Sequence, residues 1–239
     1  RNFEYISEDP RLTSELAVPI VRGIETSDVA ACVKHFAMNN QETERLWVNV
    51  EADERTMREI YFPAFQAVVQ KAGAKSIMGS YNLYKDQHGC HNQYLLNDIL
   101  KGDWGFDGVV VSDWGGVHNT QEAITNGLDM EFGSWTNGLS NGASNAYDNY
   151  YLANPYLQLI REGKVGTKEL DDKVRRILRL AYRTNMDRNR PYGALCSEAH
   201  FAAARQIGEE GIVLLQNNNN VLPIDLSRAK KIAVIGENA

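Results

Sequence analysis

Residues 108–118, with the sequence GVVVSDWGGVH, place a single carboxylate, Asp113, directly before the indole of Trp114. The valines in front of Asp113 are typical of a strand buried on both faces, as in a parallel sheet covered by helices. A carboxylate at the end of such a strand could be the nucleophile of glycoside hydrolysis, beside an indole on which a sugar ring could stack. Alternatively, Asp113 could cap a helix that begins near His118. This stretch alone supports both interpretations equally.

The chain alternates apolar segments of strand character with amphipathic helical patterns, which is typical of an α/β fold with a parallel sheet. Residues 133–145 are rich in Gly, Ser and Asn, which predicts a long loop after a strand end, where binding loops occur. We predict strands at 29–36, 76–81, in the apolar run before Asp113, at 128–132 and at 230–236, and helices at 53–71, 92–101, 118–126, 146–162, 168–185 and 197–211.

The composition is that of a soluble globular chain, since 43% of its 239 residues are hydrophobic, enough for one large core or two small ones. The formal net charge is -6, with acidic and basic residues interspersed. This pattern offers no basic stripe for nucleic acid and no polybasic patch for a membrane, and it is compatible with a neutral polyol substrate. No apolar run has membrane-spanning length.

The cysteines indicate neither a disulfide framework nor a zinc site. Cys32, Cys90 and Cys196 are odd in number and far apart, without CxxC spacing. We expect all three to be small buried residues.

Polar motifs follow the ends of three predicted strands, and further motifs flank them. Together these motifs resemble glycoside hydrolase family 3, in its β-glucosidase-like branch. The resemblance covers nearly the whole chain, in the expected order. It rests on RNFEYISEDP at the start, Lys34-His35, NNQETER at 39–45, Ser80-Tyr81-Asn82, Ser112-Asp113-Trp114, GLDMEFG, LDDKVRRILRLAY, GEEGIVLLQNNNNVLPI and KKIAVIG.

The resemblance implies a role for each matching position. Asp113 would form a covalent glycosyl-enzyme, and Trp114 would flank the sugar. Residues binding the non-reducing-end sugar or its aglycone would be Lys34, His35, Arg1, Arg45, Tyr81 and, on the aglycone side, Met78. Cations near Asp113 would keep it ionised, and a Tyr hydroxyl could orient it.

Each of these residues also has a structural alternative. Lys34 could be a solvated charge at a strand end, and His35 a core histidine with satisfied hydrogen bonds. Arg45 could serve only a salt bridge, Tyr81 only strand packing, and Met78 only the core. Their joint occurrence in order favours the functional reading.

The resemblance implies an α/β architecture with a TIM-like (β/α)8 barrel, followed by the start of an α/β sandwich. Residues 1–185 would be a partial barrel, incomplete at its N-terminus and lacking an expected sugar-binding Asp. Residues 186–228 would be a linker and helix, and residues 229–239 the first strand of a truncated second domain. We therefore expect the sequence to be a fragment.

The general acid/base is expected from a Glu in that second domain, which would complete the site. The chain reads KHFAMNNQE where the N-acetylglucosaminidase branch carries a KHFPGHG-type loop, which argues against that branch. Glu131, Glu42 and Glu44 are the local carboxylates that could protonate the leaving oxygen, but we expect them to be supporting or surface groups.

The expected activity is therefore that of a retaining, exo-acting β-glucosidase, which would act on β-glucosides or cello-oligosaccharides without metal or organic cofactor. A β-xylosidase or exo-β-glucanase of the same family remains an alternative, because one exocyclic hydroxymethyl is a modest energetic difference. A catalytically incomplete sugar-binding fragment is another, and a non-catalytic interaction protein a third. The compartment is open: soluble, whether cytoplasmic, periplasmic or secreted.

Overall fold

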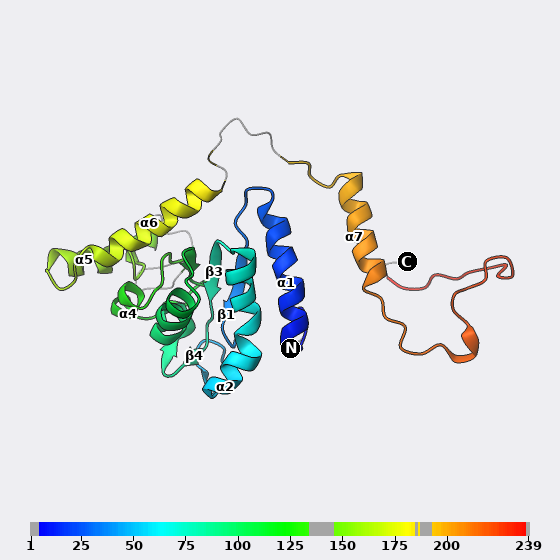
Figure 1. Cartoon of the computed structure of the whole chain (residues 1–239), viewed down its shortest axis with the longest axis horizontal. Helices are drawn as coiled ribbons and strands as arrows, with labels where there is room; N and C mark the ends of the chain where they lie inside the picture. Colours follow the sequence, from blue (N-terminus) through cyan, green and yellow to red (C-terminus); the bar gives the residue numbers. More distant parts are fainter. Residues whose placement is uncertain (1–4, 134–145, 185, 187–192, 238–239) are drawn as a thin grey trace. The chain divides into compact units, whose positions relative to one another are not determined.

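The computed structural model describes residues 5–133, 146–184, 186 and 193–237. The chain forms two compact units, Arg1–Arg188 and Asn189–Ala239. Among the described residues, no helix is both long and apolar enough to cross a membrane. Figure 1 shows the elements of both units.

The first unit is built on a parallel sheet in the order β1-β3-β6, comprising β1 (Cys32–Phe36), β3 (Ser76–Gly79) and β6 (Val109–Val111). Ile77 of β3 pairs with Val110 of β6, and Val111 makes a parallel bridge to Met130. All three valines of β6 are buried, because the sheet is covered on both faces. The prediction of an α/β unit with parallel strands is confirmed.

Helices and a second small sheet surround these strands. The small sheet has the order β2-β4-β5. Its strands are β2 (Asn49–Val50), β4 (Leu83–Tyr84) and β5 (Gln87–His88). The helices of this unit are α1 (Pro10–Glu25), α2 (Glu54–Thr56), η1 (Met57–Tyr61), α3 (Pro63–Ala67), η2 (Val68–Ala72), η3 (Gly89–His91), η4 (Gln93–Asp103), α4 (Thr120–Thr125), η5 (Ala146–Asn149), α5 (Asn154–Arg161) and α6 (Lys168–Arg183).

An aromatic cluster forms the centre of the main core. The ring of Phe36, at the end of β1, lies 5.8 Å from that of Phe62 and 5.5 Å from that of Trp104. All three side chains are buried. Packing at this density fixes the end of β1 relative to the helices that cover it.

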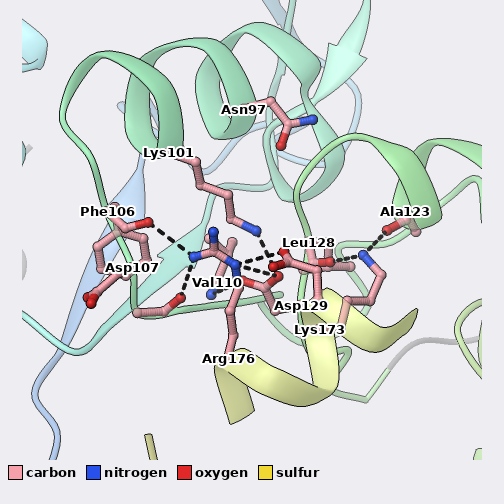
Figure 2. Close-up of polar contacts among 12 residues, drawn as sticks. Asn97, Lys101, Phe106, Asp107, Val110, Ala123, Leu128, Asp129, Lys173 and Arg176 are labelled. Carbon is pink, nitrogen blue, oxygen red and sulfur yellow. Dashed lines mark hydrogen bonds and ion pairs between the residues drawn. The ribbon is translucent and has the colours of Figure 1, made fainter. Parts of the chain in front are cut away.

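A buried ionic network joins α6 to the strand that leads to Asp113 (Figure 2). Asp129 accepts from the Lys101 ammonium at 2.7 Å and from the backbone N–H of Val110 at 2.8 Å. Arg176 of α6 donates to the carbonyls of Phe106 and Gly108, both at 3.0 Å. The carboxylate thus pairs with a buried cation and also holds β6 in register.

Three predicted elements of this unit differ in the structure. The helix predicted at 53–71 is interrupted at Phe62 and divided into α2, η1, α3 and η2, with Pro63 at the start of α3. Residues 128–132 form only a bridge at Met130 rather than a strand, since the described residues offer a single pairing partner, Val111. The helix predicted at 146–162 is split into η5 and α5. Pro155 stands in the first turn of α5, where a missing N–H and a fixed φ favour a helix start over continuation.

The second unit consists of α7 (Glu198–Glu210), the short helix η6 (Asn218–Asn220) and irregular segments. Ser197 caps α7 and exchanges hydrogen bonds with His200 in a capping box. The strand predicted at 230–236 is wrong for this structure, because these residues have no regular structure. An extended segment becomes a strand only when a neighbour accepts its backbone hydrogen bonds, and no described segment of this unit pairs with it.

The expectation of three buried cysteines holds for Cys90 and is wrong for Cys32 and Cys196. Cys32 begins β1, which is an edge strand of the sheet, and Cys196 precedes α7. Both positions leave the side chain open to solvent.

Candidate active site

Asp113 lies two residues beyond β6, at the carboxyl end of the parallel sheet, and is only 6% exposed. Its backbone N–H donates to Sγ of Cys90 at 3.4 Å, and its Oδ1 accepts the N–H of Trp114 at 2.8 Å. Its carbonyl accepts the N–H of Gly116 at 3.1 Å. The intervening Gly115 has φ +71°, which a residue without Cβ adopts at little cost, so the chain turns sharply after the carboxylate.

His35 approaches the other oxygen of this carboxylate. Its Nε2 lies 3.3 Å from Oδ2 of Asp113, although the two residues come from strands at opposite sides of the three-stranded sheet. Both β1 and β6 run parallel, so their carboxyl ends meet at the same edge of the sheet.

Tyr81 follows β3, the strand between β1 and β6, and contacts the same site. Its hydroxyl donates to the carbonyl of Trp114 at 2.7 Å. Burial and the negative charge of Asp113 raise the pKa of Tyr81, so its hydroxyl stays protonated and able to donate. The guanidinium of Arg45 lies 4.6 Å from the centroid of the Tyr81 ring and pairs with Glu42 at 2.6 Å.

Trp114 presents an exposed indole beside the buried carboxylate, with 62% of its surface accessible. Its ring lies 5.7 Å from that of Phe132. Ser112 ties this side of the site to the segment after Met130, because its N–H donates to the Met130 carbonyl at 2.9 Å and its Oγ accepts the N–H of Phe132 at 2.8 Å. The segment GLDMEFG thus supports both Asp113 and Trp114.

A cavity of about 500 Å³ adjoins this group on the side of β1. His35 belongs to both, since its ring lines the cavity and its Nε2 reaches Asp113. Lys34 also lines the cavity and is exposed. The remaining lining residues come from the chain before α1, from α1, from β1 and the loop after it, and from η1 and α3; they include Tyr5, Glu8, Met38, Asn39, Asn40 and Tyr61.

The structure therefore brings together five of the predicted residues, Asp113, His35, Tyr81, Arg45 and Trp114, with Lys34 beside them. Met78 lies in β3, half-buried, and pairs with Val111, so it sits within the sheet below the site. Arg1 lies outside the described residues.

The local carboxylates are occupied by other contacts. Glu131 accepts the backbone N–H groups of Tyr151 and Leu152, one on each oxygen, at 3.1 and 2.7 Å. Glu42 pairs with Arg45. Glu44 is exposed, and its carbonyl closes the turn that carries Arg45. Because both its oxygens accept backbone N–H groups, Glu131 is placed to support the loop at Tyr151 and Leu152.

Sequence reasoning missed the role of Cys90. A Cβ added at Gly116 would lie 2.6 Å from the Cys90 sulfur, and one added at Gly79 would lie 2.7 Å from the Cys90 Cα. The sulfur therefore packs directly beneath the turn that carries Asp113, where burial raises its pKa to about 12. The only sequence signal is the coincidence of a Cys with glycines at two strand ends.

No group of three or more His, Cys, Asp or Glu side chains is arranged to hold a metal ion within the described parts of the chain.

Comparison with known proteins gives a consistent result. The family model of the Glycosyl hydrolase family 3 N terminal domain matches residues 1–180. The chain is 50% identical over its whole length to Beta-glucosidase BoGH3A of Bacteroides ovatus, covering 33% of that protein. It is 40% identical to Thermostable beta-glucosidase B of Acetivibrio thermocellus, covering 29% of it, and 36% identical to an Exo-alpha-(1->6)-L-arabinopyranosidase of Bifidobacterium longum, covering 30%.

Comparison with solved structures also finds proteins named as β-glucosidases. Beta-glucosidase 3B from Thermotoga neapolitana in complex with glucose superposes with a TM-score of 0.84 at 35% identity, covering 94% of this chain and 31% of that one. The beta-glucosidase from Kluyveromyces marxianus in complex with glucose gives a TM-score of 0.78 at 33% identity, covering 93% and 26%. The chain thus spans about a third of the length of the relatives it matches.

Proposed function

The chain belongs to glycosyl hydrolase family 3, and from this membership we propose that it carries the nucleophile and sugar-binding residues of a retaining, exo-acting β-glucosidase. The observation that carries the proposal is the position of Asp113. Its carboxylate is buried at a parallel strand end, meets Nε2 of His35 at 3.3 Å, and lies beside an exposed indole. The relatives named as β-glucosidases support the choice of substrate class.

In the proposed mechanism an oxygen of Asp113 attacks the anomeric carbon and forms a covalent glycosyl-enzyme, which water then hydrolyses with retention of configuration. The N–H of Trp114 and the imidazole of His35 hold the carboxylate in one orientation before attack. A fixed nucleophile lowers the barrier because its ordering cost is met during folding.

The sugar would bind between Trp114 and the residues around His35. The indole offers a flat apolar face to the ring, while Lys34, His35 and Arg45 offer donors to its hydroxyls. Tyr81 would keep the turn after Asp113 in place through its bond to the Trp114 carbonyl. We assign Met78 to the aglycone side and Arg1 to the same sugar pocket, as the resemblance implies.

A retaining glycosidase needs a second carboxyl group ~5 Å from the nucleophile to protonate the leaving oxygen. Because Glu131 and Glu42 are engaged elsewhere and Glu44 is exposed, we assign that group to a Glu of the remaining protein. We propose that residues 1–185 belong to a (β/α)8 barrel, residues 186–228 to a linker and helix, and residues 229–239 to the start of an α/β sandwich that completes the site. The parallel β1-β3-β6 sheet and the superposed structures support this arrangement.

A pentopyranoside is the second candidate substrate. The relative from Bifidobacterium longum is named as an arabinopyranosidase, and a pentopyranose lacks the exocyclic hydroxymethyl of glucose. The two candidates are distinguished by kcat/KM of the whole protein on an aryl β-glucoside, a β-xyloside and an α-L-arabinopyranoside. A preference of tenfold or more for the glucoside would support the β-glucosidase assignment.

The test of the nucleophile is intact-mass spectrometry of the 239-residue chain after incubation with 2,4-dinitrophenyl 2-deoxy-2-fluoro-β-glucoside, followed by peptide mapping. This reagent needs no proton donor because its leaving group departs as an anion. We expect one adduct, on Asp113, that is lost in Asp113→Asn. The matched control is Asp107→Asn, because Asp107 is an exposed carboxylate paired with Arg183 and its loss leaves the adduct in place.

An adduct at another residue would overturn the assignment. No adduct on a chain that circular dichroism shows to be folded would contradict the claim that these residues form a working glucosyl subsite. Azide rescue of activity in the chain alone would yield β-glucosyl azide if only the proton donor is missing and α-glucosyl azide if the nucleophile is missing.

A further inference from the structure

We propose that Trp47, His88 and His118 form a pH-dependent clamp, here called the aromatic clamp, that positions Arg45 at the sugar site. The clamp holds Arg45 against Tyr81 while both histidines are neutral and releases it when they are protonated. The inference rests on the proposed function, since it names what holds one of the sugar-binding residues in place.

The three rings of the aromatic clamp pack against one another beside the site. The His88 and His118 rings are stacked, with centroids 3.9 Å apart and planes 22° apart. The Trp47 ring lies 6.0 Å from that of His88 and 5.3 Å from that of His118. His88 is buried and His118 is half-buried, whereas Trp47 is 62% exposed, so its position depends on these contacts rather than on enclosure.

A single tight turn transmits the position of Trp47 to Arg45. The N–H groups of Trp47 and Val48 both donate to the Glu44 carbonyl, at 2.8 and 2.9 Å. Nε2 of His88 lies 3.0 Å from the carbonyl of Leu46, the residue between Arg45 and Trp47. Arg45 therefore belongs to the same turn that the aromatic clamp contacts at Leu46 and Trp47. Its guanidinium lies 4.6 Å from the centroid of the Tyr81 ring.

The stack of the aromatic clamp requires neutral imidazoles, whereas the bond from His88 to Leu46 needs only a proton on Nε2. A carbonyl oxygen only accepts, so Nε2 of His88 donates to Leu46. The backbone N–H of His118 donates to Nε2 of His91 at 3.2 Å, so that nitrogen carries no proton. Protonation of His91 would place two donors face to face, and protonation of both stacked rings would place two positive charges 3.9 Å apart.

The ionisable groups that face the clamp are few within the described residues. His91 of η3 lies 5.5 Å from His88, centroid to centroid, and its Nδ1 lies 2.7 Å from Oε2 of Glu122 on α4. Glu122 thus faces the far side of His91 rather than the stack itself. No salt bridge joins His88 or His118 to a carboxylate in the described structure.

The pKa directions agree with this geometry. Burial lowers the pKa of His88, and burial together with the neighbouring His88 lowers that of His118 to about 4. Burial, His88 and His118 lower the pKa of His91 to about 3. The folded clamp is therefore neutral at pH 7, and its stabilisation is lost as the pH falls from about 6.5 towards 4.

The first test monitors the environment of Trp47 in the aromatic clamp in the absence of substrate. The chain is labelled with 5-fluorotryptophan, and the Trp47 resonance is identified by its absence in Trp47→Phe. We expect its ¹⁹F shift to titrate around pH 4, near the lowered pKa of His118, while that of Trp104, buried in the core, stays constant over this range. His118→Phe keeps a flat ring and removes one proton site, so it should flatten the titration. His200→Gln alters an exposed histidine of α7 and should leave it unchanged.

The second test measures KM and kcat of the whole protein on an aryl glucoside across pH. In wild type KM should rise about tenfold as the pH falls through the Trp47 transition, which is the loss of one hydrogen bond to a charged group. His118→Ala should show the raised KM already at pH 7, and His118→Phe should keep the low KM to more acidic pH. A purely structural role would lower the apparent kcat in proportion to the folded fraction seen by circular dichroism and leave KM unchanged.

The two proposals fail separately. A titrating Trp47 in a protein without glycosidase activity would overturn the proposed function and leave the clamp intact as a pH-dependent contact. An active enzyme in which Trp47 does not titrate, or in which His118→Ala leaves KM unchanged, would overturn the clamp.

Discussion

Gly133 lies so close to the indole of Trp114 that a Cβ atom added to it would stand 2.3 Å from Cε3 of the ring. Its φ of +58° is also one that L side chains rarely adopt. The backbone at Gly133 therefore lies against one edge of the indole and restricts its rotation. An aromatic side chain that is 62% exposed would otherwise be free to change rotamer.

The first prediction concerns this contact. Gly133→Ala should displace the Trp114 ring and raise KM for an aryl glucoside about tenfold in the whole protein, with a smaller change in kcat, because ring stacking contributes to substrate binding. The measurement is steady-state kinetics with Trp fluorescence as a check on the ring. Gly163→Ala is the matched control, since Gly163 has a similar φ of +67° but nothing within 4 Å. Equal effects of the two substitutions would attribute the change to backbone strain.

The second prediction concerns the buried carboxylate of Asp129. Asp129→Asn should lower the free energy of unfolding by about 3 kcal/mol, because it leaves the ammonium of Lys101 in a buried site without its counter-charge. Urea unfolding of the chain measures this. Glu59→Gln removes an exposed carboxylate that pairs with Arg55 and should cost less than ~0.5 kcal/mol. If the two variants are equally stable, the network in Figure 2 does not stabilise β6.

The third prediction compares two glycines with opposite surroundings. A Cβ at Gly89 would lie 2.1 Å from Oγ and 2.7 Å from the carbonyl oxygen of Ser80, so Gly89→Ala should destabilise the chain by about 1–3 kcal/mol. Gly23 lies inside α1 with nothing within 4 Å, so Gly23→Ala should stabilise it by about 0.5–1 kcal/mol. Thermal unfolding decides both signs, and a destabilising Gly23→Ala would show that α1 packs differently.

The fourth prediction is a pH dependence of stability carried by His91. Its side chain is buried, and burial with two neighbouring histidines lowers its pKa from 6.5 to about 3. Below about pH 6.5 His91 of the unfolded chain is protonated, whereas His91 of the folded chain stays neutral until about pH 3. The free energy of unfolding therefore falls as the pH drops from 6.5 towards 3. Between pH 7 and 4.5 the wild type should lose about 2 kcal/mol more than His91→Gln, in urea unfolding at both values. The same loss in both proteins would assign the pH dependence to other groups.

The sequence by itself determined the order of the elements and the residue types at the strand ends. Period and composition are local properties, so the parallel strands at Ser76–Gly79 and Val109–Val111 and the helix at Lys168–Arg183 could be predicted from them. These local properties gave wrong predictions where the formation of a strand depends on a pairing partner. Residues 230–236 have the composition of a strand but no partner in the described second unit, and residues 128–132 pair only at Met130.

Only the tertiary structure decided which side chains meet. His35 and Asp113 are 78 positions apart in the numbering, yet parallel strands bring them to 3.3 Å. The Cys90 sulfur contacts the turn at Asp113, and the aromatic clamp contacts the turn that carries Arg45. Each contact joins segments that are far apart in the sequence. Distances between such segments are set by strand register and by close packing of the core, which are collective properties of the folded chain rather than of any stretch of residues.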